Sequence, residues 1–424
     1  MNAPAPHRGG AAEARRRRRH RADRLLRLLG LGAISLALGL LGVLIATLVI
    51  GATPALTQTK LRVTFAISPE LIDPADPGIG AYRLILRRGV AALLPEQPTT
   101  MAEWREIGGI VTGNTQFAIR DAVMADPSLI GRNLTLTVPV SDAYDQLGKG
   151  LTSRDTPPER RKLSDREIAR FDALTARGAV SRPFNWELIT RSNSRFPETA
   201  GLAGAIVGSF YMLLVCFVVS FPAGIAAAVW LEEFAPRNRL TDAVEVNINN
   251  LAAVPSIVFG LLGLSVLIGV FGLPRSTPLV GGLVLSLMTL PTIIIVTRAA
   301  LRAVPRSIRE AAHGVGASRH QVVLHHVLPL AMPGILTGTI IGLAHALGET
   351  APLLLIGMNA FITDPPGGIL EASTALPTQI FIWAGSAEHG FVSRTCAAIL
   401  VLLGFLLAMN AVAIYLRQRL ERKT

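Results

Sequence analysis

His345 and Glu349 form an ionisable pair inside one of the most apolar stretches of the chain, GLAHALGETAPLLLIG at 342–357. A spacing of four residues puts both side chains on one face of a helix, within reach of each other. A charge at bilayer depth costs at least ~2.5–3.5 kcal/mol on insertion scales, so such residues usually face a pathway or a partner. The pair could serve a passing ion, or it could hold two helices together as a structural contact.

Thr337 and Thr350 lie near this pair, and their hydroxyls could donate hydrogen bonds to an oxyanion or bond back to their own helix. The sequence contains no phosphate-binding loop, HExxH, paired-cysteine zinc motif or nucleophile elbow. The nearest fragment, GKG at 148–150, lacks the upstream glycine and the following Ser or Thr. We therefore expect no catalytic residue, no metal site and no cofactor bound by this chain, which should not hydrolyse ATP itself.

The composition indicates a membrane protein. Of 424 residues, 50% are hydrophobic and only 17% are charged, and the apolar residues fall in long blocks. Much of the net charge of +12 sits at 15–24 and beside apolar blocks, which fits anchoring at a membrane surface better than a nucleic-acid groove. The two cysteines, Cys216 and Cys396, form no disulfide framework or metal spacing.

Six blocks are long enough to cross a ~30 Å hydrocarbon core as helices. They are 29–53, 200–228, 250–271, 277–297, 333–357 and 396–416. The first block is too long for a signal peptide and has no convincing cleavage site, so we interpret it as a retained anchor. The distribution of Arg and Lys then predicts cytoplasmic tails at 1–28 and 417–424, with the segment 54–199 outside.

The 54–199 segment differs from the blocks around it. It is mixed in charge and holds two strand-like stretches, LRVTFAI at 61–67 and LTLTVPV at 134–140. A helical run at 163–178 opens with Ser164 and Glu167 three residues later, which is a capping-box pattern. We predict a small α+β domain outside the membrane. The stretch 232–245, between the second and third blocks, could be an amphipathic elbow helix or a solvated loop.

The loop between the fourth and fifth blocks carries the strongest motif, REAAHGVGASRHQVVLHHVLPLAMPGILTG at 309–338. Its residue types suit a protein interface. Alanines allow close approach of a partner, Gly316 permits a turn with positive φ, and Glu310 offers a carboxylate for a hydrogen bond or ion pair. Pro329 is expected to end the second short helix. The alternative interpretation is an ordinary cytoplasmic helical hairpin. The motif residues are Glu310, Ala311, Ala312, Gly316, Leu328 and Pro329.

This spacing resembles the EAA loop of bacterial ABC importer permeases, here within 298–332. One departure is His326, where the motif usually has Ile or Val, a role that Val327 could fill. The stretches LAAVPSIVFGLLGL (251–264), TLPTIIIVTRAALRAVPRSIREAA (289–312) and ALGETAPLLLIG (346–357) are similar to the phosphate-specific permease family PstA. The similarity covers roughly 200–416, and the 54–199 segment lies outside it.

The resemblance implies an all-α polytopic membrane protein with about six transmembrane helices, the type I ABC importer permease fold, and an inserted α+β domain. It implies a non-enzymatic permease for inorganic phosphate in a bacterial inner membrane, lipid-embedded, with both termini cytoplasmic. The implied partners are a related second permease, two copies of an ATPase that uses ATP and Mg²⁺, and a periplasmic phosphate-binding protein, with no nucleic acid. The alternatives are a permease for sulfate or molybdate, or a membrane sensor or scaffold that uses the 54–199 domain.

The resemblance also bears on the polar pair. The family pattern is A-R-x-x-G-E, so His345 stands where a permanent cation is expected, while Glu349 fits. A histidine is only partly charged near neutral pH, and a carboxylate repels an anion. We therefore expect Glu349 to orient or neutralise a cation, from His345 or from the second permease. We assign His345, Glu349, Thr350 and Thr337 to the candidate translocation pathway.

Overall fold

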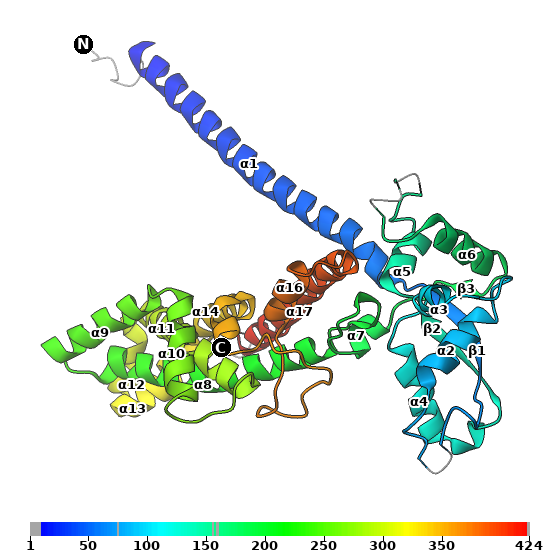
Figure 1. The fold of residues 1–424 in the computed structure, drawn as a ribbon. Helices are drawn as coiled ribbons and strands as arrows, with labels where there is room; N and C mark the ends of the chain where they lie inside the picture. The colour runs from blue at the N-terminus through cyan, green and yellow to red at the C-terminus, as the bar shows by residue number, and fades with distance from the viewer. Residues whose placement is uncertain (1–9, 74–75, 155–156, 158–160, 422–424) are drawn as a thin grey trace, which may run out of the picture. The chain divides into compact units, whose positions relative to one another are not determined.

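The computed structural model describes residues 10–421, apart from 74–75, 155–156 and 158–160 (Figure 1). Residues 1–51 and 52–424 form two compact units. The first unit is one helix, α1 (Gly10–Ala52), of 43 residues. At 1.5 Å per residue the helix is about 65 Å long, roughly twice the hydrocarbon thickness of a bilayer. It contains both the predicted span at 29–53 and the predicted tail from residue 10 on, while residues 1–9 of that tail lie outside the described residues.

The second unit begins with an antiparallel sheet in the order β2-β1-β3. Its strands are β1 (Lys60–Ala66), β2 (Asn133–Pro139) and β3 (Val180–Ser181). Along β1, Leu61, Val63 and Phe65 are buried and the residues between them face outward, because successive side chains of a strand point to opposite faces. The two predicted strands are confirmed, each one residue earlier than expected.

Short helices cover the buried face of this sheet with their apolar residues, among them Ile85, Ile107, Ile119 and Phe171. These helices are α2 (Tyr82–Ala91), α3 (Met101–Gly108), α4 (Thr115–Ala125), α5 (Asp142–Gly148) and α6 (Asp165–Ala176). The predicted cap of α6 is confirmed: Ser164 Oγ accepts from the Glu167 amide, and the Glu167 carboxylate accepts from the Ser164 amide at 2.8 Å.

Long apolar helices follow. They are α8 (Ala203–Val229), α11 (Pro278–Ala303), α14 (Leu328–Gly348) and α17 (Gly390–Glu421), with the shorter α16 (Leu376–Ala384) before the last. Helix α11 packs against both α8 and α14, and α14 packs against α17. In the described chain five helices, α1 included, are long and apolar enough to span a membrane, and a bent pair makes a possible sixth. The last helix continues past residue 416 into the predicted tail, of which residues 422–424 are not described.

The bent pair corrects the predicted straight span at 250–271. The chain forms α9 (Arg239–Ala252), turns by 103°, and continues as α10 (Ser256–Leu262) and the π-helical segment η6 (Gly263–Ile268). The break precedes Pro255, because a proline disfavours helical backbone in the residue before it. Of the two possibilities for 232–245, a helix therefore forms from Arg239 on. The 13 residues 256–268 extend only about 20 Å.

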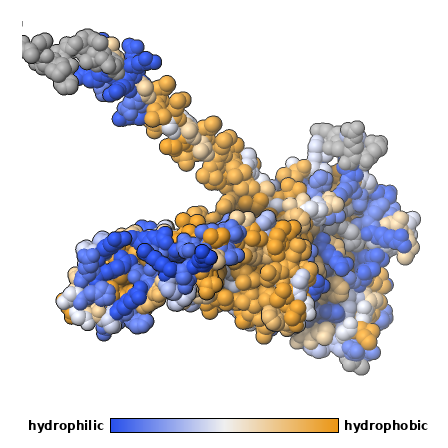
Figure 2. Space-filling view, turned by 90° about the vertical axis from the view of Figure 1, so that its left-hand side faces the viewer, coloured by the Kyte–Doolittle hydropathy of each residue, from blue (hydrophilic) through white to orange (hydrophobic). Residues whose placement is uncertain are grey.

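Small residues set the spacing of the long helices. A Cβ on Gly338 of α14 would lie 2.0 Å from Val296 Cγ1 of α11, and one on Gly282 of α11 would lie 2.5 Å from Val215 Cβ of α8. Meanwhile large side chains of α8 such as Phe210 and Val218 are exposed. Figure 2 shows the result as a broad hydrophobic surface over the helical core. Close helix approach through small residues, with apolar residues outside, is the packing expected in lipid.

Candidate coupling loop and translocation pathway

The predicted coupling loop forms a short helix, a glycine turn and a second helix. The helices are α12 (Arg306–Gly314) and α13 (Arg319–Gln321), which leads into the π-helical segment η7 (Val322–Val327). Glu310 and Ala311 are exposed, whereas Ala312 packs with the buried Val322 and Val327. Gly316 has φ of +88°, and no atom lies within 4 Å of where its Cβ would be. The backbone conformation, and not lack of space, therefore requires glycine there.

Exposed apolar side chains on this loop were missed by sequence reasoning. Val315 at the turn is 85% exposed and Leu324 is 55% exposed. His326 is also exposed while Val327 is fully buried, so Val327 supplies the packing expected at the motif's aliphatic position. An apolar residue at a polar loop tip, beside the required glycine, is the signal that could have drawn attention to Val315.

Pro329 does not end the second helix, contrary to expectation. Residues 319–348 form one continuous helical run, and Leu328 and Pro329 open α14. The π-helical turns of η7 immediately precede the proline. A proline ring clashes with the carbonyl four residues before it, which here is His325 within η7, and the wider π turn relieves that clash. Leu328 is half-buried and Pro329 is exposed.

Acidic residues at the end of α8 contact the first helix of the loop, α12. The segment η5 (Trp230–Phe234) carries Glu233, whose Oε1 accepts from Arg309 Nη2 at 2.7 Å. The same guanidinium donates to the carbonyls of Leu301 at 2.9 Å and Val304 at 2.7 Å, at the end of α11. Arg309 is the neighbour of Glu310, so one side chain ties the loop to α8 and to α11.

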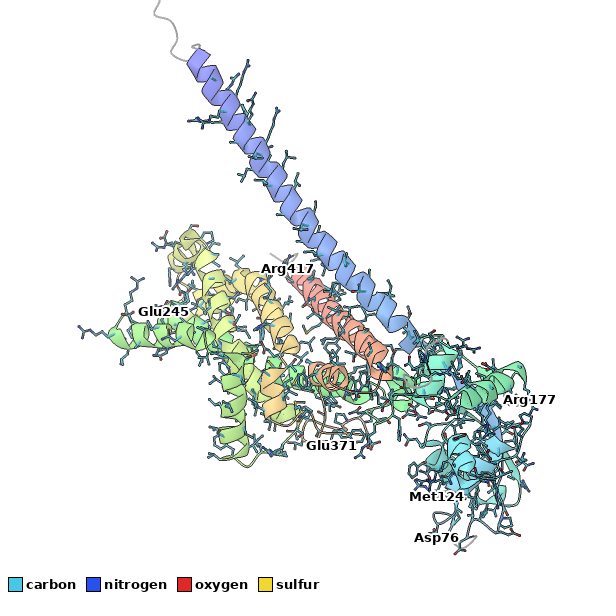
Figure 3. The ribbon with its side chains drawn as sticks, turned by 45° about the horizontal axis from the view of Figure 1, so that its top comes forward. Asp76, Met124, Arg177, Glu245, Glu371 and Arg417 are labelled. Atoms are coloured by element: carbon cyan, nitrogen blue, oxygen red, sulfur yellow. The ribbon has the colours of Figure 1, made fainter. Side chains whose placement is uncertain are left out.

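Further contacts extend this attachment. Glu232 pairs with Arg302 at 2.9 Å and with Arg298 at 3.3 Å, and Arg298 also pairs with Glu245 of α9 at 2.9 Å. Glu245 is labelled in Figure 3. Arg319 at the start of the second helix, α13, donates to the Glu233 carbonyl and lies 5.4 Å from the centre of the Phe234 ring. We call Glu232, Glu233 and Glu245 the acidic clamp.

Sequence reasoning did not find the acidic clamp. A signal was present, since two adjacent glutamates close an apolar block while Arg298 and Arg302 stand one helical turn apart on another. Nothing in the sequence, however, indicated that these two segments meet.

The polar pair lies at the end of α14. His345 Nε2 and Glu349 Oε1 are 3.2 Å apart, so the predicted contact forms. Glu349 is not inside the helix as expected, because α14 ends at Gly348 and Glu349 adopts extended backbone with ψ of 125°. The predicted block at 333–357 is therefore broken, and continues after Thr350 as α15 (Ala351–Leu355). The side chain of His345 is 70% exposed and that of Glu349 only 16%.

The two threonines differ in their surroundings. Thr337 Oγ1 donates to the Pro333 carbonyl of its own helix at 2.8 Å and accepts from Arg417 Nη1 at 3.2 Å. Arg417, labelled in Figure 3, belongs to α17 and was assigned to the tail by its sequence position. Thr350 is half-buried just before α15. The structure thus places the guanidinium of Arg417 at Thr337, about two helical turns from His345. It does not unite the four predicted pathway residues.

Two family models match the chain. Residues 220–424 match the binding-protein-dependent transport system inner membrane component, and residues 13–158 match a domain of unknown function, DUF3333. The first match contains the coupling loop and the polar pair. The second contains the predicted anchor and most of the α+β region.

Individual proteins agree with the first match. The phosphate transport system permease protein PstA 2 of Mycobacterium bovis is 34% identical over 240 residues, which is 55% of this chain and 77% of the relative. A probable ABC transporter permease protein, YqgI of Bacillus subtilis, is 34% identical over 46% of this chain and 67% of its own length.

Among solved structures, the inward-facing MetNI methionine ABC transporter is 19% identical over 55% of this chain and 96% of that chain, with a TM-score of 0.39. That likeness carries no further conclusion about this chain. The identities to the transport permeases, over more than two thirds of their length, decide the assignment. The chain belongs to the PstA family of ABC transporter permeases, within the binding-protein-dependent inner membrane components.

Proposed function

We propose that this chain is the permease subunit of an ATP-driven importer for inorganic phosphate. The observation that supports it best is the 34% identity to a PstA protein over 240 residues. The family match at 220–424 contains the coupling loop with its exposed Glu310. An exposed carboxylate beside a positive-φ glycine and an exposed valine suits docking to another protein.

The partners follow from the same proposal. A related second permease completes the pathway, two copies of an ATPase subunit bind ATP and Mg²⁺, and a periplasmic phosphate-binding protein delivers the anion. The chain itself contributes no ATP-binding loop. It resides in a bacterial inner membrane with both termini in the cytoplasm, so that 54–199 lies outside and 298–332 inside.

The coupling loop would then act as a lever on the helical core. When the ATPase subunits close, they displace the loop at Glu310. Arg309 passes this displacement to α11 through the Leu301 and Val304 carbonyls, and to α8 through Glu233. Because α8 and α11 pack tightly through small residues, they move together, and α14 follows through the Gly338 contact.

The end of α14 would lie beside the translocation pathway. His345 is exposed on this chain and is oriented by Glu349, which leaves it free to face the second permease or the anion. Glu349 itself is too shielded and too negative to bind phosphate directly. Its role is to orient the imidazole through the 3.2 Å contact.

Radiolabelled phosphate uptake tests the proposal, in proteoliposomes that contain both permeases and the ATPase, supplied with binding protein. Glu310→Ala should reduce uptake at least tenfold, because it removes the docking carboxylate, while Ser307→Ala on the same exposed helix should not. Uptake of sulfate or molybdate without phosphate would instead identify the rival permease. Undiminished uptake by Glu310→Ala would remove the coupling role, and undiminished uptake by His345→Ala with Glu349→Gln would make the pair structural.

A further inference from the structure

A cavity of about 350 Å³ opens in the α+β region, between α2 and α3 and close to the start of the helical core. Its walls come from α2, from the carboxyl end of α3 and from the turn before α4. Polar and charged residues that line it are Arg83, Arg87, Arg105, Gln116, Ser141 and Glu198. No motif drew attention to it, because these residues are scattered over more than a hundred positions.

Three arginines line this cavity. Arg83 and Arg87 lie four residues apart on α2, and Arg105 lies on α3. Within the part of the chain that the structure describes, none of the three forms an ion pair with a carboxylate. Their neighbours do: Arg166 pairs with Glu103 at 2.8 Å and Arg170 with Glu106 at 3.0 Å. Acidic residues on α3 are thus used elsewhere, and the cavity keeps its positive charge.

The backbone of α3 is shaped to accept one of these arginines. A Cβ on Gly108 would lie 3.0 Å from Arg87 Cγ and 3.1 Å from Arg87 Nε. Glycine at the end of α3 therefore lets the Arg87 side chain lie flat across it. An arginine that only caps the carboxyl end of a helix would also lie across that end. Such a cap explains Arg87 but not the other two arginines of the cavity.

Glu198 lines the same cavity. It belongs to η4 (Pro197–Thr199), is 3% exposed, and its Oε2 is buried without a hydrogen-bond partner in the described structure. A buried unpaired carboxylate oxygen is costly, and such groups call for a ligand, a water or a proton. Burial raises the pKa of Glu198 to about 7, so it exchanges a proton near neutral pH.

We infer that this cavity binds a small protonated oxyanion of the phosphate type. Guanidinium groups bind such oxygens through paired hydrogen bonds, and three arginines that form no ion pair in the described structure concentrate anions at the cavity. One of them, Arg83, donates to Gln116 Oε1 at 3.4 Å. Hydrogen phosphate also carries an O–H that can donate to Glu198, which sulfate lacks at neutral pH. The inference rests on the proposed function for the substrate class and gives the α+β region a role: anion capture on the outer side.

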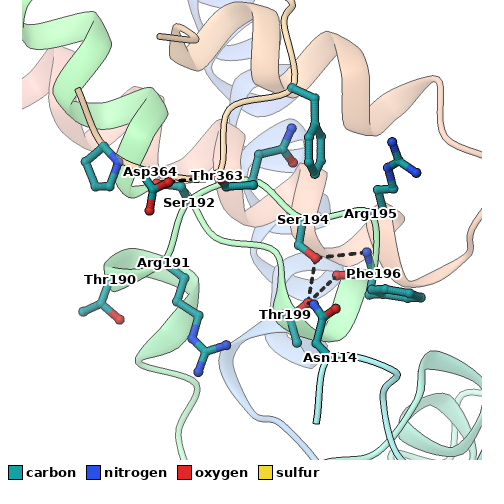
Figure 4. A pocket seen from close by; sticks show the side chains of 13 residues that line it. Asn114, Thr190, Arg191, Ser192, Ser194, Arg195, Phe196, Thr199, Thr363 and Asp364 are labelled. Atoms are coloured by element: carbon teal, nitrogen blue, oxygen red, sulfur yellow. Dashed lines mark hydrogen bonds between the residues drawn. The ribbon is translucent and has the colours of Figure 1, made fainter. Parts of the chain in front are cut away.

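A second cavity lies next to the first. It has a volume of about 490 Å³, and Phe196 lines both. Figure 4 shows Arg191, Arg195, Ser194, Thr199 and Asn114 around it, with Asp364 at its edge. Ser192 in its wall is buried, its Oγ has no partner in the described structure, and it would lie 3.0 Å from a Cβ on Gly204, in the first turn of α8. The second cavity thus shares a wall, Phe196, with the arginine cavity and has Ser192, next to the beginning of the helical core, in its own wall.

The test is equilibrium binding of ³²P-phosphate to the assembled transporter in nanodiscs, without ATP and without binding protein. Wild type should bind phosphate saturably, arsenate should displace it, and sulfate should not. The double variant Arg87→Gln, Arg105→Gln should bind at least tenfold more weakly. The matched control is Arg88→Gln, which neutralises the adjacent arginine of α2 that does not line the cavity. Glu198→Gln should lessen the preference for phosphate over sulfate.

Uptake with binding protein, measured on the same preparations, separates this inference from the proposed function. Phosphate import by a wild-type transporter that shows no saturable binding would overturn the arginine site and leave the permease assignment intact. Unchanged affinity in the double variant would also overturn it. Arg87→Lys, which keeps the charge, should retain part of the affinity and shows that a loss in the double variant is not misfolding. Sulfate binding equal to phosphate would contradict the role of Glu198.

Discussion

The α+β region and the helical core differ in the kind of residue that they expose. In the α+β region, Leu61, Val63 and Phe65 point inward and polar residues face out, as in a water-soluble domain. In α8, Ser209 and Ser220 are buried while Phe210 and Val218 are exposed. The contrast shows that the solvent differs between the two regions. Where lipid surrounds a helix, burying large apolar side chains gains little, and close contact through small residues gains more.

The largest effect is expected when a small residue of the helical core is enlarged. Gly338→Leu should prevent stable packing of α14 on α11, because its Cβ would overlap Val296. We expect little folded protein by size-exclusion chromatography in detergent and no transport. Gly404→Leu on α17 is the control, since no atom lies within 4 Å of its Cβ position. Equal yields of the two variants would show that helix contact in the core does not depend on small residues.

A smaller effect is expected where the core carries charge. Glu233→Gln removes the ionic partner of Arg309, and a hydrogen bond to a charged group contributes about 1.5–3 kcal/mol. In reconstituted transporter, the phosphate imported per ATP hydrolysed should fall about tenfold, since 1.4 kcal/mol corresponds to a factor of ten.

The matched variant for this loop is Arg306→Gln, an exposed neighbour on α12. Its transport stoichiometry should stay at the wild-type value, and Glu233→Asp should restore part of the coupling. If Glu233→Gln couples as well as wild type, the acidic clamp is only a structural contact.

The third effect concerns two carboxyl groups within the α+β region. The pKa of Glu198 rises from 4.5 unfolded to about 7 folded through burial, so the folded state holds its proton more tightly. The contribution of Glu198 to the free energy of unfolding is therefore complete below pH 4.5. It decreases by about 3 kcal/mol as the pH rises through about 7. Glu198→Gln should remove this loss, so its Tm relative to wild type should increase by a few degrees between pH 5 and 8.

Glu103 provides the opposite sign for the same thermal measurement. Hydrogen bonds from the Thr99 and Thr100 amides lower the pKa of this carboxyl. The stabilisation from ionised Glu103 is thus present above its unfolded pKa and lost on acidification. The Tm of Glu103→Gln relative to wild type should therefore decrease as the pH rises. If the Tm values of both variants change with pH in the same direction, burial does not set the pKa of Glu198.

Much of the architecture could be predicted from local sequence. The strands at 61–67 and 134–140 follow from alternation, and the start of α6 follows from Ser164 and Glu167. The positive φ at Gly316 and the burial of Val327 also agree with expectation. These features depend on interactions within a few residues, which the sequence displays directly. The docking and pathway roles of the predicted residues stay predictions.

Other features depend on segments far apart and escaped prediction. The 103° turn before Pro255, the end of α14 before Glu349 and the continuous helix through Pro329 were each expected otherwise. A proline can end a helix, bend it or be absorbed by a π turn, and the neighbouring helices decide among these outcomes. The cavity of Arg83, Arg87 and Arg105 likewise exists only because α2 and α3 pack on one sheet.

By itself, the sequence determined which segments are apolar enough for a membrane, where the α+β region begins, and which family the loop and the polar pair indicate. Only the tertiary structure decided which charges meet. Arg309 contacts Glu233 across 76 residues, and Arg417 contacts Thr337 across 80. Apolar periodicity is a property of one segment, whereas an ion pair needs two segments at a distance of about 3 Å. That distance is fixed by how the helices pack.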